Sequence, residues 1–121
     1  MRRKPGTLVP LEAAICRQAA AMRTNGAHEF HGYELARRIA DAEERKALTA
    51  YGTLYRALAR LEDMGLLTSR WEDPAIPARE NRPGRRLYTL TESGLAAARE
   101  AERAERAAAR AVRARRRWAP A

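Results

Sequence analysis

Few residues of this sequence can carry covalent or redox chemistry. The chain has one cysteine, Cys16, so no disulfide can form within it. This usage is compatible with a reducing cytosol, and we expect a cytoplasmic location. We interpret Cys16 as a thiol packed beside the apolar face of a helix. The alternative is a redox sensor, which would need an exposed thiol of low pKa.

Long hydrophobic runs are also missing. No run approaches the roughly 20 apolar residues of a membrane span, and no apolar segment follows the basic start of the chain, as a signal peptide would require. His28, His31 and Cys16 fall short of the four ligands of a usual structural metal site. We recognise no phosphate-binding glycine loop, catalytic carboxylate pair or nucleophile motif. The sequence therefore predicts no enzyme, cofactor, metal or membrane contact.

Aromatic residues make up only 6% of the chain, and Lys4 and Lys46 are the only lysines. Arginine supplies almost all of the positive charge, and the net charge is +9 with a pI near 10.9. Such a basic balance is typical of nucleic-acid binders, and the arginine fork suits phosphate and guanine. The alternative is that this charge serves only solubility. The motifs of the sequence have to distinguish it from nucleic-acid binding.

Apolar residues at spacings of three and four predict three helices in the first half of the chain. The first has its apolar face at Leu8, Leu11, Ile15, Ala19 and Met22 and stops at Asn25 and Gly26. The second covers about 32–44. The third begins after Thr49, a good N-cap, and ends at Gly65.

After the third helix, the apolar residues no longer recur at helical spacing. Residues 66–71 and 85–90 predict two strands, and 73–84, with three prolines, predicts a loop between them. Thr91 caps a last helix that continues to about Trp118. The predicted fold is mainly α with a small β-hairpin: a winged helix-turn-helix domain over 1–90, followed by a C-terminal dimerisation helix over 91–121.

In such a fold the third helix enters the major groove of DNA and the hairpin loop lies along the backbone. The polar face of this helix and the loop give the candidate contacts. They are Thr49, Thr53, Tyr55, Arg56 and Arg60 on the helix, and Arg82, Arg85 and Arg86, with Arg79 nearby, on the wing. We expect Arg56 to contact a base edge and Arg60 a phosphate. The alternatives are an ordinary solvated helix face and a loop that merely carries charge.

Four segments resemble the PadR family of transcriptional regulators. They are residues 32–35 (GYEL), 52–58 (GTLYRAL), 61–67 (LEDMGLL) and 82–94 (RPGRRLYTLTESG). The resemblance covers about residues 8–98. It implies a dimeric winged-helix repressor, often autoregulatory, with DNA contact by Thr53, Tyr55 and Arg56. It also implies backbone contact by Tyr33 and the wing arginines. Packing at the start of the second helix is an equal alternative for Tyr33.

The last helix departs from the bulkier apolar seam often found in this family. Small residues recur at alternating spacings of three and four, which predicts a close but weakly associating homodimer seam. The predicted interface consists of Leu11, Ile15, Met22, Ala97, Ala101, Ala104, Ala108, Ala111 and Trp118. A lone helix is the alternative. Only Trp118 offers an aromatic ring there, which makes a small-molecule effector pocket at the dimer centre doubtful.

Two function classes remain. The first is a DNA-binding regulator that acts on an operator in double-stranded DNA. The second is a winged-helix adaptor that binds proteins and does not contact DNA. The small, hydroxyl-bearing start of the third helix and the arginine-rich wing favour the first, because a protein-binding surface more often exposes apolar or aromatic residues.

Overall fold

The computed structural model describes residues 8–43 and 51–118. Its elements follow in the order α1 (Pro10–Thr24), β1 (Phe30–His31), α2 (Gly32–Glu43), α3 (Tyr51–Asp63), β2 (Leu67–Trp71), α4 (Ala75–Glu80), β3 (Arg86–Leu90) and α5 (Glu92–Trp118). The chain is mainly helical with one small antiparallel sheet, which confirms the predicted fold class. No helix among the described residues is long and apolar enough to cross a membrane.

The helix ends expected at Gly65 and Gly26 form as the sequence predicts. Gly65 has a φ of +77°, and Leu66 N donates to Leu61 O at 2.9 Å, which closes α3 with a Schellman motif. Gly26 (φ +92°) ends α1 in the same way. Thr49 and the segment 45–48, expected as the turn before the third helix, lie outside the described residues, as does the basic start of the chain.

The sheet has one strand more than expected. Its order is β1-β3-β2, and Phe30 pairs with Tyr88 while Leu67 pairs with Leu90. The prediction of a two-stranded hairpin was therefore incomplete. A two-residue strand such as β1 carries no period, so only its partner β3 defines it.

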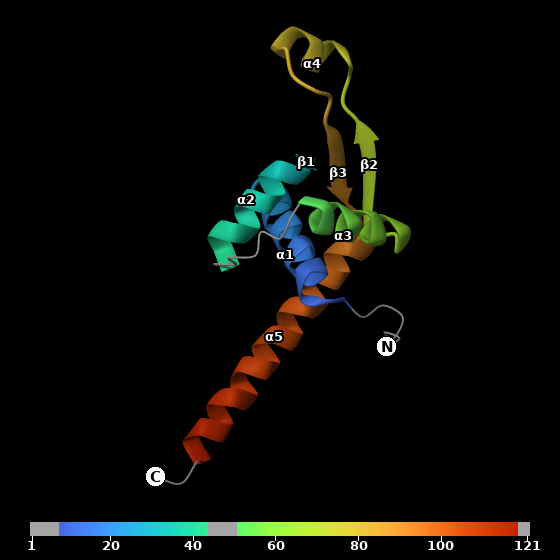
Figure 1. Cartoon of the computed structure of the whole chain (residues 1–121). Coiled ribbons are helices and arrows are strands. Elements are labelled where there is room, and N and C mark those ends of the chain that lie inside the picture. The colour runs from blue at the N-terminus through green and yellow to red at the C-terminus, as the bar shows by residue number, and fades with distance from the viewer. Residues whose placement is uncertain (1–7, 44–50, 119–121) are drawn as a thin grey trace.

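The wing also differs from the prediction. Residues 75–80 form the helix α4 at its tip, where we expected an irregular loop. Asp73 Oδ1 accepts a hydrogen bond from Ala75 N at 2.9 Å, and Asn81 ends the helix with a φ of +54°. A six-residue helix is too short to show a 3.6-residue period, and Pro77, which is buried, falls within its first turn, where proline is tolerated. Figure 1 shows α4 at the end of the β2–β3 hairpin, away from the other helices.

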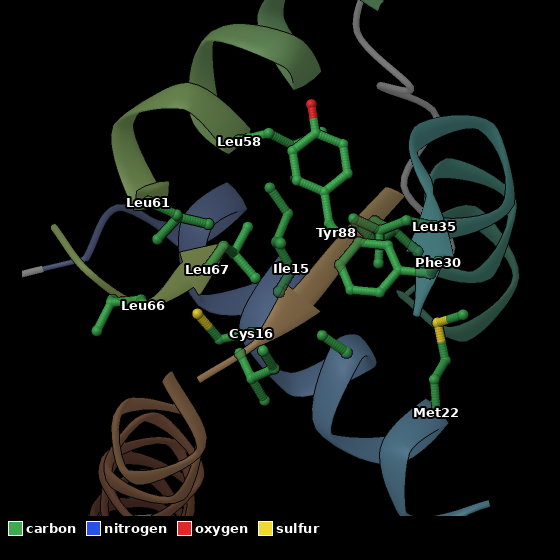
Figure 2. Packing of buried hydrophobic residues seen from close by; sticks show 14 of the residues in the cluster. Ile15, Cys16, Met22, Phe30, Leu35, Leu58, Leu61, Leu66, Leu67 and Tyr88 are labelled. Carbon is green, nitrogen blue, oxygen red and sulfur yellow. The ribbon is translucent and has the colours of Figure 1, made fainter. Parts of the chain in front are cut away.

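One hydrophobic core joins all the layers. Ile15, Met22, Leu35, Leu58 and Leu67 are almost fully buried and come from three helices and the sheet. Figure 2 shows Phe30 and Tyr88 beside this cluster, with their rings stacked at 5.9 Å between centroids. Cys16 also lies in this core, and burial raises the pKa of its thiol to about 11, which agrees with a packed thiol.

The core explains one wrong prediction. Ile15 and Met22 have no exposed surface within their own chain, so they cannot lie at a dimer interface. Helical periodicity identifies a buried face, but it does not say whether the same chain or a partner buries it. Leu11, the third member of that set, remains partly exposed.

The long helix α5 begins at a cap that holds it to the rest of the domain. Thr91 Oγ1 accepts from Gly94 N at 3.0 Å and donates to Gly65 O at 2.8 Å. Gly94 and Ala98 are buried against the domain, whereas residues 102–118 are exposed. Figure 1 shows this outer part of α5 extending away from the domain, opposite to the wing.

Candidate nucleic-acid interface

Aromatic and basic side chains from α2, α3 and the three strands line one groove between α3 and the base of the wing. Its volume is about 380 Å³. Tyr33 comes from α2, Tyr55 from α3, and Arg85 and Arg86 from the wing and β3. The fold thus brings together four residues that the sequence nominated separately.

The groove depends on a close approach at Gly32. A Cβ atom at this position would lie 2.7 Å from the hydroxyl oxygen of Tyr55, so only glycine lets the phenol end of the tyrosine come this close to the backbone. Tyr33 and Tyr55 remain 52% and 45% exposed. Both phenols are therefore accessible at the surface, rather than filling the core.

The exposed face of α3 continues from this groove. Arg56 is exposed, and its Nη2 donates to Thr53 Oγ1 at 3.3 Å, so the two side chains share one surface. Arg56 has no ion pair with any carboxylate among residues 8–43 and 51–118. A guanidinium in this state is available to an acceptor outside the chain.

Arg60, one turn further along α3, is held differently. Its Nε lies 2.9 Å from Oε2 of Glu12, whose side chain is 3% exposed. Glu12 Oε1 also accepts from Val9 N at 3.1 Å. Arg60 thus neutralises a buried carboxylate between α1 and α3, and we do not retain it as a phosphate contact.

Arg82 is also engaged within the chain. Its guanidinium lies 2.6 Å and 3.1 Å from the two carboxylate oxygens of Glu72 and 2.7 Å from Glu80. Glu72 Oε1 accepts from Arg85 N as well, at 2.9 Å. This network joins the two chain segments of the wing neck, residues 72 and 82–85, just below α4. The four arginines of this cluster look alike in the sequence, but Glu72 and Glu80 pair with one of them, so we remove Arg82 from the DNA contacts.

The remaining wing arginines are freer. Arg85 is exposed, and its guanidinium makes no ion pair within the described part of the chain. Arg86 lies 5.5 Å above the ring of Trp71 and donates from Nε to Ser69 Oγ at 2.9 Å. The groove is therefore lined by Arg85, which has no ion pair among the described residues, and by Arg86, which contacts Trp71 and Ser69.

Sequence reasoning did not identify Trp71 and His31, which also line the groove. Trp71 is 63% exposed on β2, an unusual exposure for the largest apolar side chain. His31 ends β1, and its Nδ1 accepts from Glu34 N at 3.4 Å. Desolvation, followed by the nearby Arg85, lowers the pKa of His31 from its ordinary 6.5 and so favours the neutral ring. The sequence assigned Trp71 to a strand but to no site, and it offered His31 only as a possible metal ligand.

The network at the wing neck predicts a pH-dependent wing. The hydrogen bonds from Arg82 lower the pKa of Glu72 from its ordinary 4.5. The pair therefore holds the wing above pH 4.5 and fails as pH falls through the lowered pKa. We expect Arg82→Ala to accelerate amide hydrogen exchange over residues 72–86 several-fold at pH 7, and the wild type to lose its protection only under acid conditions.

Arg79→Ala is the matched control, because Arg79 lies exposed on α4 with no ion pair among the described residues. Equal exchange in the Arg82→Ala and Arg79→Ala variants would show that the Glu72–Arg82 pair does not hold the wing.

The family model and one solved structure point to the same family. The model of the transcriptional regulator PadR-like family matches residues 24–100. A PadR family transcriptional regulator from Eggerthella lenta superposes with a TM-score of 0.58 at 26% identity, covering 84% of this chain and 83% of that one. A transcriptional regulator from Clostridium thermocellum gives 0.63 at 18% identity, over 85% and 93% of the two chains, a likeness of fold alone. Pex from Synechococcus gives 0.54 at 26% identity, over 78% and 81%. No protein of curated function matches the sequence.

Proposed function

Because the chain belongs to the PadR-like family of transcriptional regulators, we propose that it is a sequence-specific DNA-binding repressor that acts as a homodimer and controls its own promoter. The observation that carries the proposal is the continuous surface formed by the exposed face of α3 and the adjoining groove, where Arg56 and Arg85 are both available. We assign base contact to this face of α3 and backbone contact to the groove.

The chemistry of each contact follows from its geometry. Arg56 can donate a bidentate pair of hydrogen bonds to guanine O6 and N7. Thr53 and Tyr55 carry hydroxyls that suit phosphate or base acceptors. Tyr33, Arg85 and Arg86 line the groove, and we assign them to contacts with the phosphate backbone. Thr49 stays in the proposal from the sequence alone.

The exposed part of α5 supports the proposed dimer. Ala104, Ala108, Ala111 and Trp118 are exposed at heptad spacing on a helix of 27 residues. A helix with small residues along one seam is suited to a second helix at short distance. A symmetric dimer would place its two α3 helices in half-sites about 34 Å, one turn of DNA, or a multiple of it, apart. No effector is part of this proposal.

The test is fluorescence anisotropy with a duplex from the promoter of its own gene and with a scrambled duplex, over a series of salt concentrations. We expect the promoter to bind at least ~1,000-fold more tightly near physiological salt, with affinity falling as salt rises. Equal binding to both duplexes, with a steep salt dependence, would contradict autoregulation and sequence specificity at that promoter. Absence of binding even at low salt would overturn DNA recognition and favour the protein-binding adaptor.

A further inference from the structure

Arginines form a continuous stripe along one face of α5. They recur at alternating spacings of four and three residues, so at 3.6 residues per turn they fall within an arc of about 80°. This arc lies on the opposite side of the helix from the alanine seam, and all of its arginines are exposed. We call this set the arginine stripe, and its members are Arg99, Arg103, Arg106, Arg110, Arg113 and Arg117.

The carboxylates of α5 do not neutralise the stripe. Two of its four glutamates pair with arginines of α1 instead. Arg103 lies 2.7 Å from Glu100 and Arg106 lies 3.9 Å from Glu102, and such exposed pairs contribute little. In the part of the chain that the structure describes, the other four arginines of the stripe have no ion pair, and the outer turns of the helix, residues 107–118, hold no acidic residue.

This arrangement of like charges disfavours the helix on its own. Side chains three or four positions apart are neighbours on a helix, and like charges at these spacings repel each other. A helix face that serves only solubility usually alternates the two signs, which avoids the repulsion. The stripe instead repeats the repulsion at each step from one arginine to the next. A polyanion that lies along the stripe would relieve it at every step.

The chemistry of the stripe favours a phosphate backbone. The arginine fork donates two parallel hydrogen bonds to phosphate. The stripe is about 27 Å long at 1.5 Å per residue, and one DNA strand carries a phosphate about every 3.4 Å, so the stripe spans about eight phosphates. A helix that binds a lipid surface carries large apolar residues beside its basic face. Val112 and Trp118 lie off the arc of the stripe, so DNA fits this face better than a bilayer does.

The stripe is also remote from the candidate nucleic-acid interface. Figure 1 shows the outer part of α5 extending away from the domain, opposite to the wing. A duplex on α3 and the wing therefore leaves the outer stripe of the same chain uncovered. A second copy packed along the alanine seam would leave it uncovered too, because the seam and the stripe are opposite faces of the helix.

We propose that the arginine stripe binds the phosphate backbone of a second DNA duplex without sequence preference, so that the protein joins two segments of DNA. One segment lies on α3 and the wing, and the other lies along α5. The inference goes beyond the proposed repressor function, and binding along the stripe does not depend on it, because neither segment has to contain an operator.

A capture assay measures this bridging. A short scrambled duplex is tethered to beads, the full chain is added at about 0.1 M salt, and retention of a fluorescent second copy of the duplex is measured. Arg113→Gln combined with Arg117→Gln removes two charges from the stripe. Arg115→Gln combined with Arg116→Gln is the matched control, because it removes the same charge from the same turn, outside the arc of the stripe.

The stripe variant should retain at least about tenfold less of the second duplex than the wild type, because each lost phosphate contact costs close to tenfold in affinity at this salt concentration. The control should retain about as much as the wild type. Arg113→Lys combined with Arg117→Lys keeps the charge and should keep most of the capture. Glutamine and lysine are both good helix formers, and far-ultraviolet circular dichroism checks that α5 stays helical.

Four results would overturn the proposal. Equal loss in the two glutamine variants would mean that net charge, rather than the stripe, holds the second duplex. Unchanged capture in both would mean that the α3 surfaces of two subunits do the bridging. A wild type that captures no second duplex bridges nothing. Binding to phosphatidylserine vesicles that only the stripe variant loses, without duplex capture, would assign the stripe to a lipid surface. The promoter titration reports operator recognition separately, so either proposal can fail while the other stands.

Discussion

Gly94→Ala is expected to destabilise the fold by about 1–3 kcal/mol, a magnitude typical of overpacking in a core. A Cβ atom at this position would collide with the carbonyl oxygen of Leu66 and lie 2.5 Å from Cδ1 of Leu90. The carbonyl cannot withdraw freely, because it accepts from Thr91 N at 3.0 Å and so helps to start α5. Thermal unfolding followed by circular dichroism should show Tm lowered by roughly 5–20 °C.

Gly84→Ala is the matched control. An added Cβ at Gly84 would meet no atom within 4 Å, and this glycine has no positive φ. Its Tm should stay close to that of the wild type. A Gly94→Ala variant as stable as Gly84→Ala would mean that α5 can shift away from the end of β3, and the close contact would then have no structural importance.

The second large effect concerns DNA. Arg56→Ala should weaken binding to the operator by about 1–3 kcal/mol and relax the preference for one base pair, because the variant loses a base-edge contact. Arg85→Ala should weaken all duplexes alike and reduce the slope of log affinity against log salt by about one, because it loses a phosphate contact. Anisotropy titrations on the operator and on a scrambled duplex measure both quantities.

Arg60→Ala separates recognition from stability on the same helix. Arg60 pairs with the buried Glu12, so its loss should lower the free energy of unfolding by about 1–3 kcal/mol. Arg56 is exposed and contacts only Thr53 among the hydrogen-bond partners described above, so its loss should leave Tm unchanged. Should Arg56→Ala and Arg85→Ala behave alike on every duplex, the division into base and phosphate contacts would be wrong.

The sequence predicted the elements whose signal is local. The apolar spacing of α1, the positive φ of Gly65 and the Thr91 cap each depend on residues within a few positions of one another. These features sufficed for the fold class and for placing α3 beside a wing. The polar face of the third helix and the basic wing selected Tyr55, Arg85 and Arg86, and the family resemblance added Tyr33; the fold brings all four into one groove.

What the sequence could not predict depends on distant partners. Arg60 and Arg56 look alike on the helix, and only the position of Glu12, 48 residues earlier, separates them. Arg82 and Arg85 also look alike in the sequence, and only the ion pair between Arg82 and Glu72 in the folded wing separates them. In the same way, β1 exists because β3 pairs with it, and Ile15 is buried by its own chain.

The placement of the two tryptophans gives the molecule a pair of built-in optical reporters. Trp71 lies on the wing beneath Arg86, and Trp118 lies at the far end of α5, on the other side of the domain. Replacing either one by phenylalanine leaves a single emitter at a known end. Nucleic acid added to the Trp71-only protein and dilution of the Trp118-only protein can thus be followed separately, without any attached dye. Association with DNA and association between subunits then become two independent signals from one unlabelled chain.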